Sequence, residues 1–62
     1  MIDLNDLLEA VNRGQVVRDQ VRVVARNGKI VDFLTTEDQP RGHEDIRVMS
    51  LIDVLQSVFD IK

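Results

Sequence analysis

The first apolar positions of the chain recur at the spacing of an amphipathic helix. Four aliphatic residues follow the i, i+3, i+4, i+7 pattern that places side chains on one stripe: Leu4, Leu7, Leu8 and Val11. Asp3 stands where an N-cap is needed, and its carboxylate suits the positive end of the helix dipole. Gly14 is a natural residue just beyond the helix C-terminus. The pattern predicts a helix at about 4–13.

A β-hairpin is predicted next. The run from Gln15 to Arg26 is rich in valine, which favours a strand, and Asn27-Gly28 accepts the positive φ angles of a type I′ turn. The return strand is predicted from Lys29 to Thr35. A regular register across this turn places Arg26 opposite Lys29. Three further pairs follow from it: Ala25 with Ile30, Val24 with Val31, and Val21 with Leu34.

Alternation along these strands predicts two different faces. The face expected to meet the helices carries six residues: Val21, Val23, Ala25, Ile30, Asp32 and Leu34. The opposite face carries six others: Arg22, Val24, Arg26, Lys29, Val31 and Phe33. That second face has an apolar centre rimmed by cations, so we expect more of the chain, or another molecule, to cover it. Asp32 on the core face suggests an edge position or a pairing with arginine rather than a functional acid, because a buried carboxylate is costly unless it is paired.

The second half of the chain predicts a loop, a short strand and a helix. Residues 36–44 are polar and contain Pro40 and Gly42, which is typical of a loop. A third strand is expected at 46–49, and a helix at about 51–60 with Ser50 as its N-cap. The apolar surface of this helix is wider than one contact needs. We therefore expect part of it to form an interface with another subunit through four residues: Val54, Val58, Phe59 and Ile61.

These elements predict one α+β domain spanning residues 1–62. Its order is α-β-β-β-α, with an antiparallel hairpin or three-stranded sheet packed against two amphipathic helices. A chain of 62 residues buries only about 60% of the surface that its unfolded form exposes. It has no cysteine and a single histidine, so disulfides and the usual zinc sites cannot supply stability. Association with a second copy, as a homodimer or higher oligomer, is the expected support.

Localisation follows from what the sequence lacks. No apolar run approaches the roughly 20 residues of a membrane span, and the start at Met1-Ile2-Asp3 has no basic and apolar leader. A cytoplasmic protein without a membrane partner is therefore expected.

Charge is unevenly distributed along the chain. The total is −3, yet residues 13–29 carry a local net charge of +4 and the remainder −7. Four cations are concentrated on or near the hairpin: Arg18, Arg22, Arg26 and Lys29. They could pair with carboxylates of the first helix (Asp3, Asp6 and Glu9), with another subunit, or with nucleic acid. The acidic total and the absence of Tyr and Trp make nucleic acid the less favoured partner.

The chemistry-bearing side chains gather in the loop at 37–45, where four carboxylates accompany His43. Their spacing matches no metal-binding motif, and the chain contains no phosphate loop or nucleophile elbow. We predict no catalytic residue, no metal ligand and no cofactor. The predicted function is a non-enzymatic protein–protein interaction module, adaptor or regulatory, that acts as a homo-oligomer. A small nucleic-acid-binding regulator that uses the basic hairpin is the alternative. The partner-binding residues common to both are seven: Arg18, Arg22, Arg26, Lys29, Val24, Val31 and Phe33.

Overall fold

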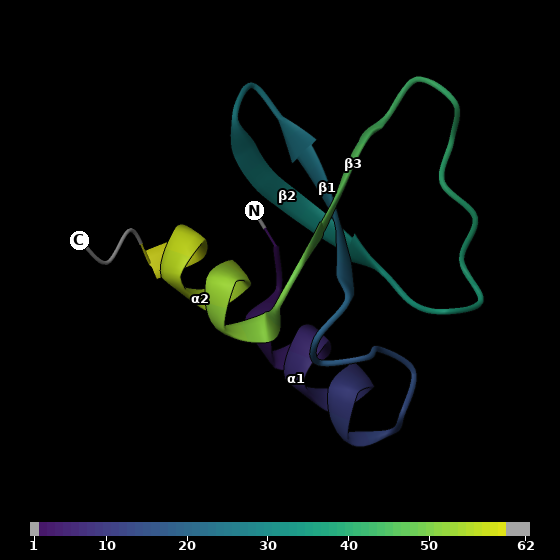
Figure 1. The fold of residues 1–62 in the computed structure, drawn as a ribbon, viewed down its shortest axis with the longest axis vertical. Helices are drawn as coiled ribbons and strands as arrows, with labels where there is room; N and C mark the ends of the chain where they lie inside the picture. Colours follow the sequence, from purple (N-terminus) through teal and green to yellow (C-terminus); the bar gives the residue numbers. More distant parts are fainter. Residues whose placement is uncertain (1, 60–62) are drawn as a thin grey trace.

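The computed structural model describes residues 2–59 as two helices and a three-stranded sheet (Figure 1). The elements follow in the order α1 (Leu4–Asn12), β1 (Val21–Arg26), β2 (Lys29–Leu34), β3 (Asp45–Met49) and α2 (Leu51–Phe59). The α+β class and the order α-β-β-β-α are thereby confirmed.

The sheet is antiparallel, with strand order β2-β1-β3. The chain therefore passes from one edge of the sheet to the other through the loop at 35–44, which extends away from both helices in Figure 1. The helices lie together at one end of that view, below the hairpin. The central strand β1 is thus the only one of the three described strands with neighbours on both sides.

Both helices begin at the predicted caps. The Asp3 carboxylate accepts hydrogen bonds from the backbone amides of Asn5 and Asp6, at 3.0 and 3.2 Å. Ser50 Oγ accepts from the amide of Asp53 at 3.2 Å. Just beyond α1, Gly14 takes a φ of 75°, the left-handed conformation that ends many helices. The N-terminal boundaries follow from these local bonds, which need no other part of the fold.

The hairpin turn is also confirmed, but the register beyond it is not. Asn27 and Gly28 have φ angles of 54° and 77°, as a type I′ turn requires. Arg26 pairs with Lys29 and Ala25 with Ile30, as predicted. After that the register shifts by one residue. Three pairs follow the shift: Val24 with Asp32, Val23 with Phe33, and Arg22 with Leu34. Val31 is the extra residue of a β-bulge.

The bulge corrects the predicted faces of the hairpin. Phe33 lies opposite Val23 and packs against the core, so it does not share a face with Val24. Asp32 is exposed and lies opposite Val24, away from the core face to which the regular register assigned it. A shift of one residue exchanges the faces of a strand. This shift is favourable because it packs an aromatic ring partly against the core and leaves the carboxylate in water.

The predicted first strand was too long at its beginning. Residues 15–20 form turns: the Gln15 amide donates to the carbonyl of Ala10 at 2.9 Å, and the Gln20 amide to that of Val17 at 3.1 Å. Val16 is buried although it lies outside any strand. At this position a valine therefore indicated burial and not a strand conformation.

One hydrophobic core joins the helices to the sheet. Four side chains are fully buried in it: Leu7, Val21, Val23 and Val54. They come from α1, β1 and α2, so both helices pack on the face of the sheet that carries Val21 and Val23. None of the described helices has the length and apolar content to cross a membrane.

Candidate functional site

Four residues of the hairpin form a surface that combines charged and apolar side chains: Arg26, Lys29, Val31 and Asp32. We call it the hairpin surface. Arg26 and Lys29 lie opposite each other beside the turn, and both are exposed. Val31 is half-buried at the bulge and Asp32 is exposed. Asp32 Oδ1 accepts a hydrogen bond from the amide of Phe33 at 2.8 Å, which occupies that amide. An apolar side chain therefore lies along the strand between side chains of opposite charge.

Arg22, which the sequence grouped with the other cations, is used differently. It is half-buried in the central strand, and its Nη2 donates to the carbonyl oxygens of Thr35 and Asp38, the latter at 3.0 Å. Arg26 lies four residues further along β1, roughly 13 Å away at the rise of an extended strand. The structure therefore separates Arg22 from the cations at the turn.

The start of the β2–β3 loop is fastened by Asp38. Its Oδ2 accepts from the Thr35 amide at 3.0 Å and from Thr35 Oγ1 at 3.1 Å. The backbone hydrogen bond from Thr35 lowers the pKa of Asp38, and the Thr35 hydroxyl and the charge of Arg22 lower it further. The Thr36 amide donates to the carbonyl of Gln15 at 2.9 Å, which ties the loop to the segment after α1.

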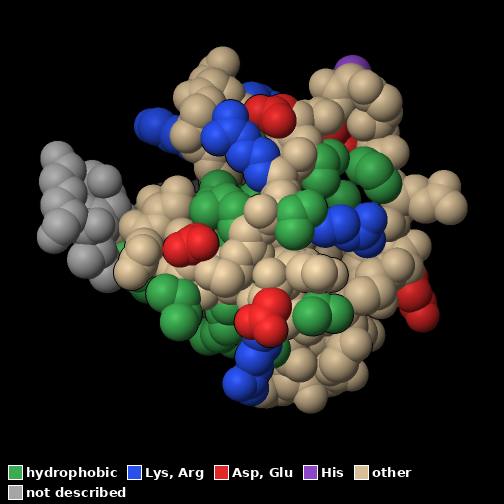
Figure 2. Space-filling model, viewed as in Figure 1, with side chains coloured by type: hydrophobic (Ala, Val, Ile, Leu, Met, Phe, Trp, Pro, Cys, Tyr) green, Lys and Arg blue, Asp and Glu red, His purple; other side chains and the backbone are tan. Residues whose placement is uncertain are grey.

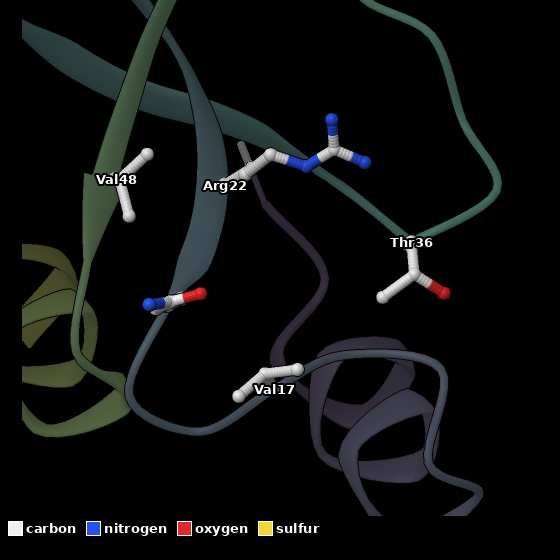
Figure 3. Close-up of a pocket in the computed structure, with 5 residues that line it drawn as sticks. Val17, Arg22, Thr36 and Val48 are labelled. Atoms are coloured by element: carbon white, nitrogen blue, oxygen red, sulfur yellow. The ribbon is translucent and has the colours of Figure 1, made fainter.

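A hollow of about 250 Å³ lies beside this anchor (Figure 3). It is lined by residues from four separate segments: Val17, Gln20, Arg22, Thr36 and Val48. Val17 and Val48 are 50% and 63% exposed, so the hollow is open to water. Arg22 is the only titratable side chain in its lining, and no acid–base pair is present there. The sequence could not reveal this hollow, because its walls are distant along the chain.

Pairing of the hairpin cations with the first helix, one of the alternatives that the sequence left open, is not found within residues 2–59. Within residues 2–59 the ion pairs are Arg13 with Glu9, and Arg47 with Asp45 at 3.2 Å. Neither pair includes Arg18, Arg26 or Lys29. Over the described part of the chain, that intramolecular pairing was therefore wrong.

The structure also revises the outer surface of α2. Val54 is fully buried, so its side chain is not on the surface, and Val58 is half-buried and packs against the core. The exposed apolar side chains of α2 are Ile52 and Phe59, at 67% and 60% exposed. Ile52 was missed, although its spacing of seven from Phe59 places both on one side of a helix. Ile61 lies outside the described residues.

The acidic loop does not assemble a metal site in the described residues. No three side chains of the metal-binding types come close enough there to hold an ion. Glu44 Oε1 instead accepts from the amide of Arg41 at 3.0 Å, as Asp38 does from Thr35. In this same range no buried side-chain nitrogen or oxygen lacks a hydrogen-bond partner. These carboxylates stabilise the loop backbone.

Figure 2 shows hydrophobic side chains across one face of the molecule, with Lys and Arg side chains beside them. Such mixed surfaces are suited to contact with another macromolecule.

A protein-family model described as Paratox matches residues 1–59. The chain belongs to the Paratox family. Paratox proteins are small non-enzymatic regulators that bind other proteins, including the competence regulator ComR. No curated protein matches the chain. The Paratox match spans all five elements, so both sheet edges and α2 lie within the family domain.

Proposed function

We propose that this Paratox-family protein regulates another protein by binding it through the hairpin surface. Its membership of a family of protein-binding regulators supports the function. The competence regulator ComR, which Paratox proteins bind, is the proposed partner. We also propose that the protein acts inside the cell.

The bulge is the observation that favours the hairpin surface. Bulges are common at sheet edges and beside functional sites, where they redirect side chains. Here the extra residue leaves Val31 half-buried and Asp32 exposed, next to the exposed Lys29. Charges of both signs around a small apolar centre help to determine partner choice and association rate. Val24 is 4% exposed and Phe33 packs on the core, so these two residues support the surface without forming its outer layer.

The test is a calorimetric titration of purified ComR with three forms of the protein. The double variant Val31→Ser/Asp32→Asn should bind at least about tenfold more weakly than wild type, since a central contact contributes more than about 1 kcal/mol. Asn keeps an oxygen for the Phe33 amide, so the strand geometry is preserved.

Ile52→Ser is the matched control, because it removes one exposed aliphatic side chain on α2. It should bind like wild type. If Ile52→Ser alone abolishes binding, the partner uses α2 and the hairpin assignment fails. If wild type does not bind ComR at all, the proposed partner is wrong.

A nucleic-acid role for the same hairpin is the second candidate. It is supported by Arg26 and Lys29, which are adjacent and exposed and form no ion pair within residues 2–59. Binding to phosphates would weaken steeply with salt, because each contact releases counterions. Gel-shift experiments on duplex and single-stranded DNA at about 50 mM salt should show no complex if protein binding is the function.

A further inference from the structure

The two edges of the sheet are protected to very different degrees. β2 is interrupted by the bulge at Val31, and Asp32 occupies the amide of Phe33. A bulge is one of the devices that prevent an edge strand from pairing with another strand, and an amide that already bonds to a side chain cannot donate to an added strand. β3 has neither. Its residues Asp45–Met49 pair one to one with β1, without a register shift and without proline.

The outer backbone of β3 has no partner within residues 2–59. The backbone hydrogen bonds formed outside the helices and the sheet involve none of residues 45–49, and no side chain bonds to the β3 backbone. An edge strand in this condition can accept another strand. Beside it, Val48 is 63% exposed, so apolar surface accompanies the unpaired backbone.

The side chains of β3 indicate which strand would fit. Asp45 and Arg47 lie on one face of the strand and form an ion pair at 3.2 Å, while Ile46 lies on the other face. In an antiparallel pair of two β3 strands with a two-fold axis at Ile46, Asp45 of each copy lies opposite Arg47 of the second copy. The two Ile46 side chains then meet at the centre. The segment Asp45-Ile46-Arg47 is therefore complementary to itself in charge and in hydrophobicity.

We propose that two copies of this protein associate through β3 and form a continuous six-stranded antiparallel sheet. Three of the four residues of the hairpin surface lie on β2, the opposite edge of each three-stranded sheet, and Arg26 lies beside the turn, so the surface remains free in the dimer. This proposal does not depend on the identity of the partner that the hairpin binds. It also differs from an interface on α2, because neither Ile52 nor Phe59 belongs to β3.

The association should be weak and dependent on concentration. Outside the central three residues the same register places Val48 opposite Glu44, and this pair of an apolar and an acidic side chain adds little to the affinity. Each copy also carries a net charge of −3, which opposes the approach of a second copy. The specificity therefore comes from two reciprocal ion pairs and one isoleucine pair.

Sedimentation equilibrium over tens to hundreds of micromolar tests the proposal with charge variants. Arg47→Glu leaves only acidic side chains at positions 45 and 47, and Asp45→Lys leaves only basic ones. Either variant alone should dimerise about tenfold more weakly than wild type, because like charges lie opposite each other. An equimolar mixture should recover association as a heterodimer, because every opposing pair is then complementary.

Circular dichroism should show all of these proteins folded, because Asp45 and Arg47 are exposed. Recovery on mixing also cannot come from two misfolded chains. A wild-type protein that stays monomeric at every concentration would overturn the proposal. So would a dimer that both single variants retain, or one that is lost in Ile52→Ser.

Discussion

The two edge strands of this sheet, β2 and β3, differ in how regularly their side chains alternate between its two faces. β2 packs Ile30 and Phe33 against the core while Asp32 stays in water, and regular alternation from Ile30 would have placed Asp32 on the core face. One extra residue, Val31, corrects the alternation. β3 alternates regularly with one-to-one pairing and needs no correction. The comparison teaches that the irregular strand is the one better protected against pairing with another strand. The bulge that turns Phe33 toward the core also makes β2 a poor template for an added strand.

The largest expected effect comes from testing which of two neighbours on β2 belongs to the core. Phe33→Ala should lower the free energy of unfolding by about 2–3 kcal/mol, somewhat less than for a fully buried ring because Phe33 is half-buried. Asp32→Ala should change it by roughly 0.5 kcal/mol, as expected for an exposed position. Urea denaturation measures both. The reverse order would mean that β2 is not bulged.

A second experiment acts on the loop that joins the two edges. Arg22→Met removes two hydrogen bonds to loop carbonyls, those of Thr35 and Asp38, while keeping an aliphatic side chain on β1. The expected loss is about 1–2 kcal/mol, since the hydrogen bonds of a charged donor are worth more than neutral ones and this side chain is only part-buried. Amide exchange in residues 35–38 should become faster.

Arg26→Met is the control for this loss, because Arg26 is exposed at the other end of the same strand. It should leave stability within roughly 0.5 kcal/mol of wild type. Equal losses in the two variants would show that the loop contacts of Arg22 are not what stabilises the protein.

Deletion of Val31 would make β2 as regular as β3. Ile30 and Asp32 would become neighbours, and the pairs of Val24 with Asp32 and of Val23 with Phe33 would be preserved. We expect a change in the free energy of unfolding below about 1 kcal/mol, together with at least about tenfold weaker binding to ComR. Chemical denaturation and calorimetry on the same sample separate the two effects. A severe loss of stability would show that the bulge also has a structural role.

The smallest expected effect is a pH dependence at the start of the loop. The Thr35 amide and hydroxyl and the charge of Arg22 lower the pKa of Asp38 below the usual value of an aspartate. A group whose pKa is lowered by folding stabilises the protein above its unfolded pKa, and this contribution is lost as pH falls through the folded pKa. Stability should therefore decline below about pH 4, and less so in Asp38→Asn. Thermal unfolding of both proteins between about pH 2 and 6 measures the difference; parallel curves would mean that other carboxylates dominate.

The sequence identified many residues of the candidate site, but not how they are arranged. The turn cations Arg26 and Lys29 were found because Asn27-Gly28 determines their pairing. The role of Arg22 was not, because its acceptors lie 13 and 16 residues away in a loop without a pattern of its own. Val31 was named for the partner surface, yet the reason for its position, the bulge, lies in what β1 places opposite it.

The sequence by itself determined the features that neighbouring residues can satisfy. The caps at Asp3 and Ser50 and the turn at Asn27-Gly28 rest on hydrogen bonds and φ angles within a few residues, so local patterns were sufficient.

Only the tertiary structure decided which faces are covered. Burial of Phe33 in place of Asp32, and of Val54 rather than Ile52, depends on what lies across the sheet or against the helix. Because such contacts join residues far apart in sequence, their energies compete only after the chain has collapsed, and a one-residue bulge costs less than a buried carboxylate.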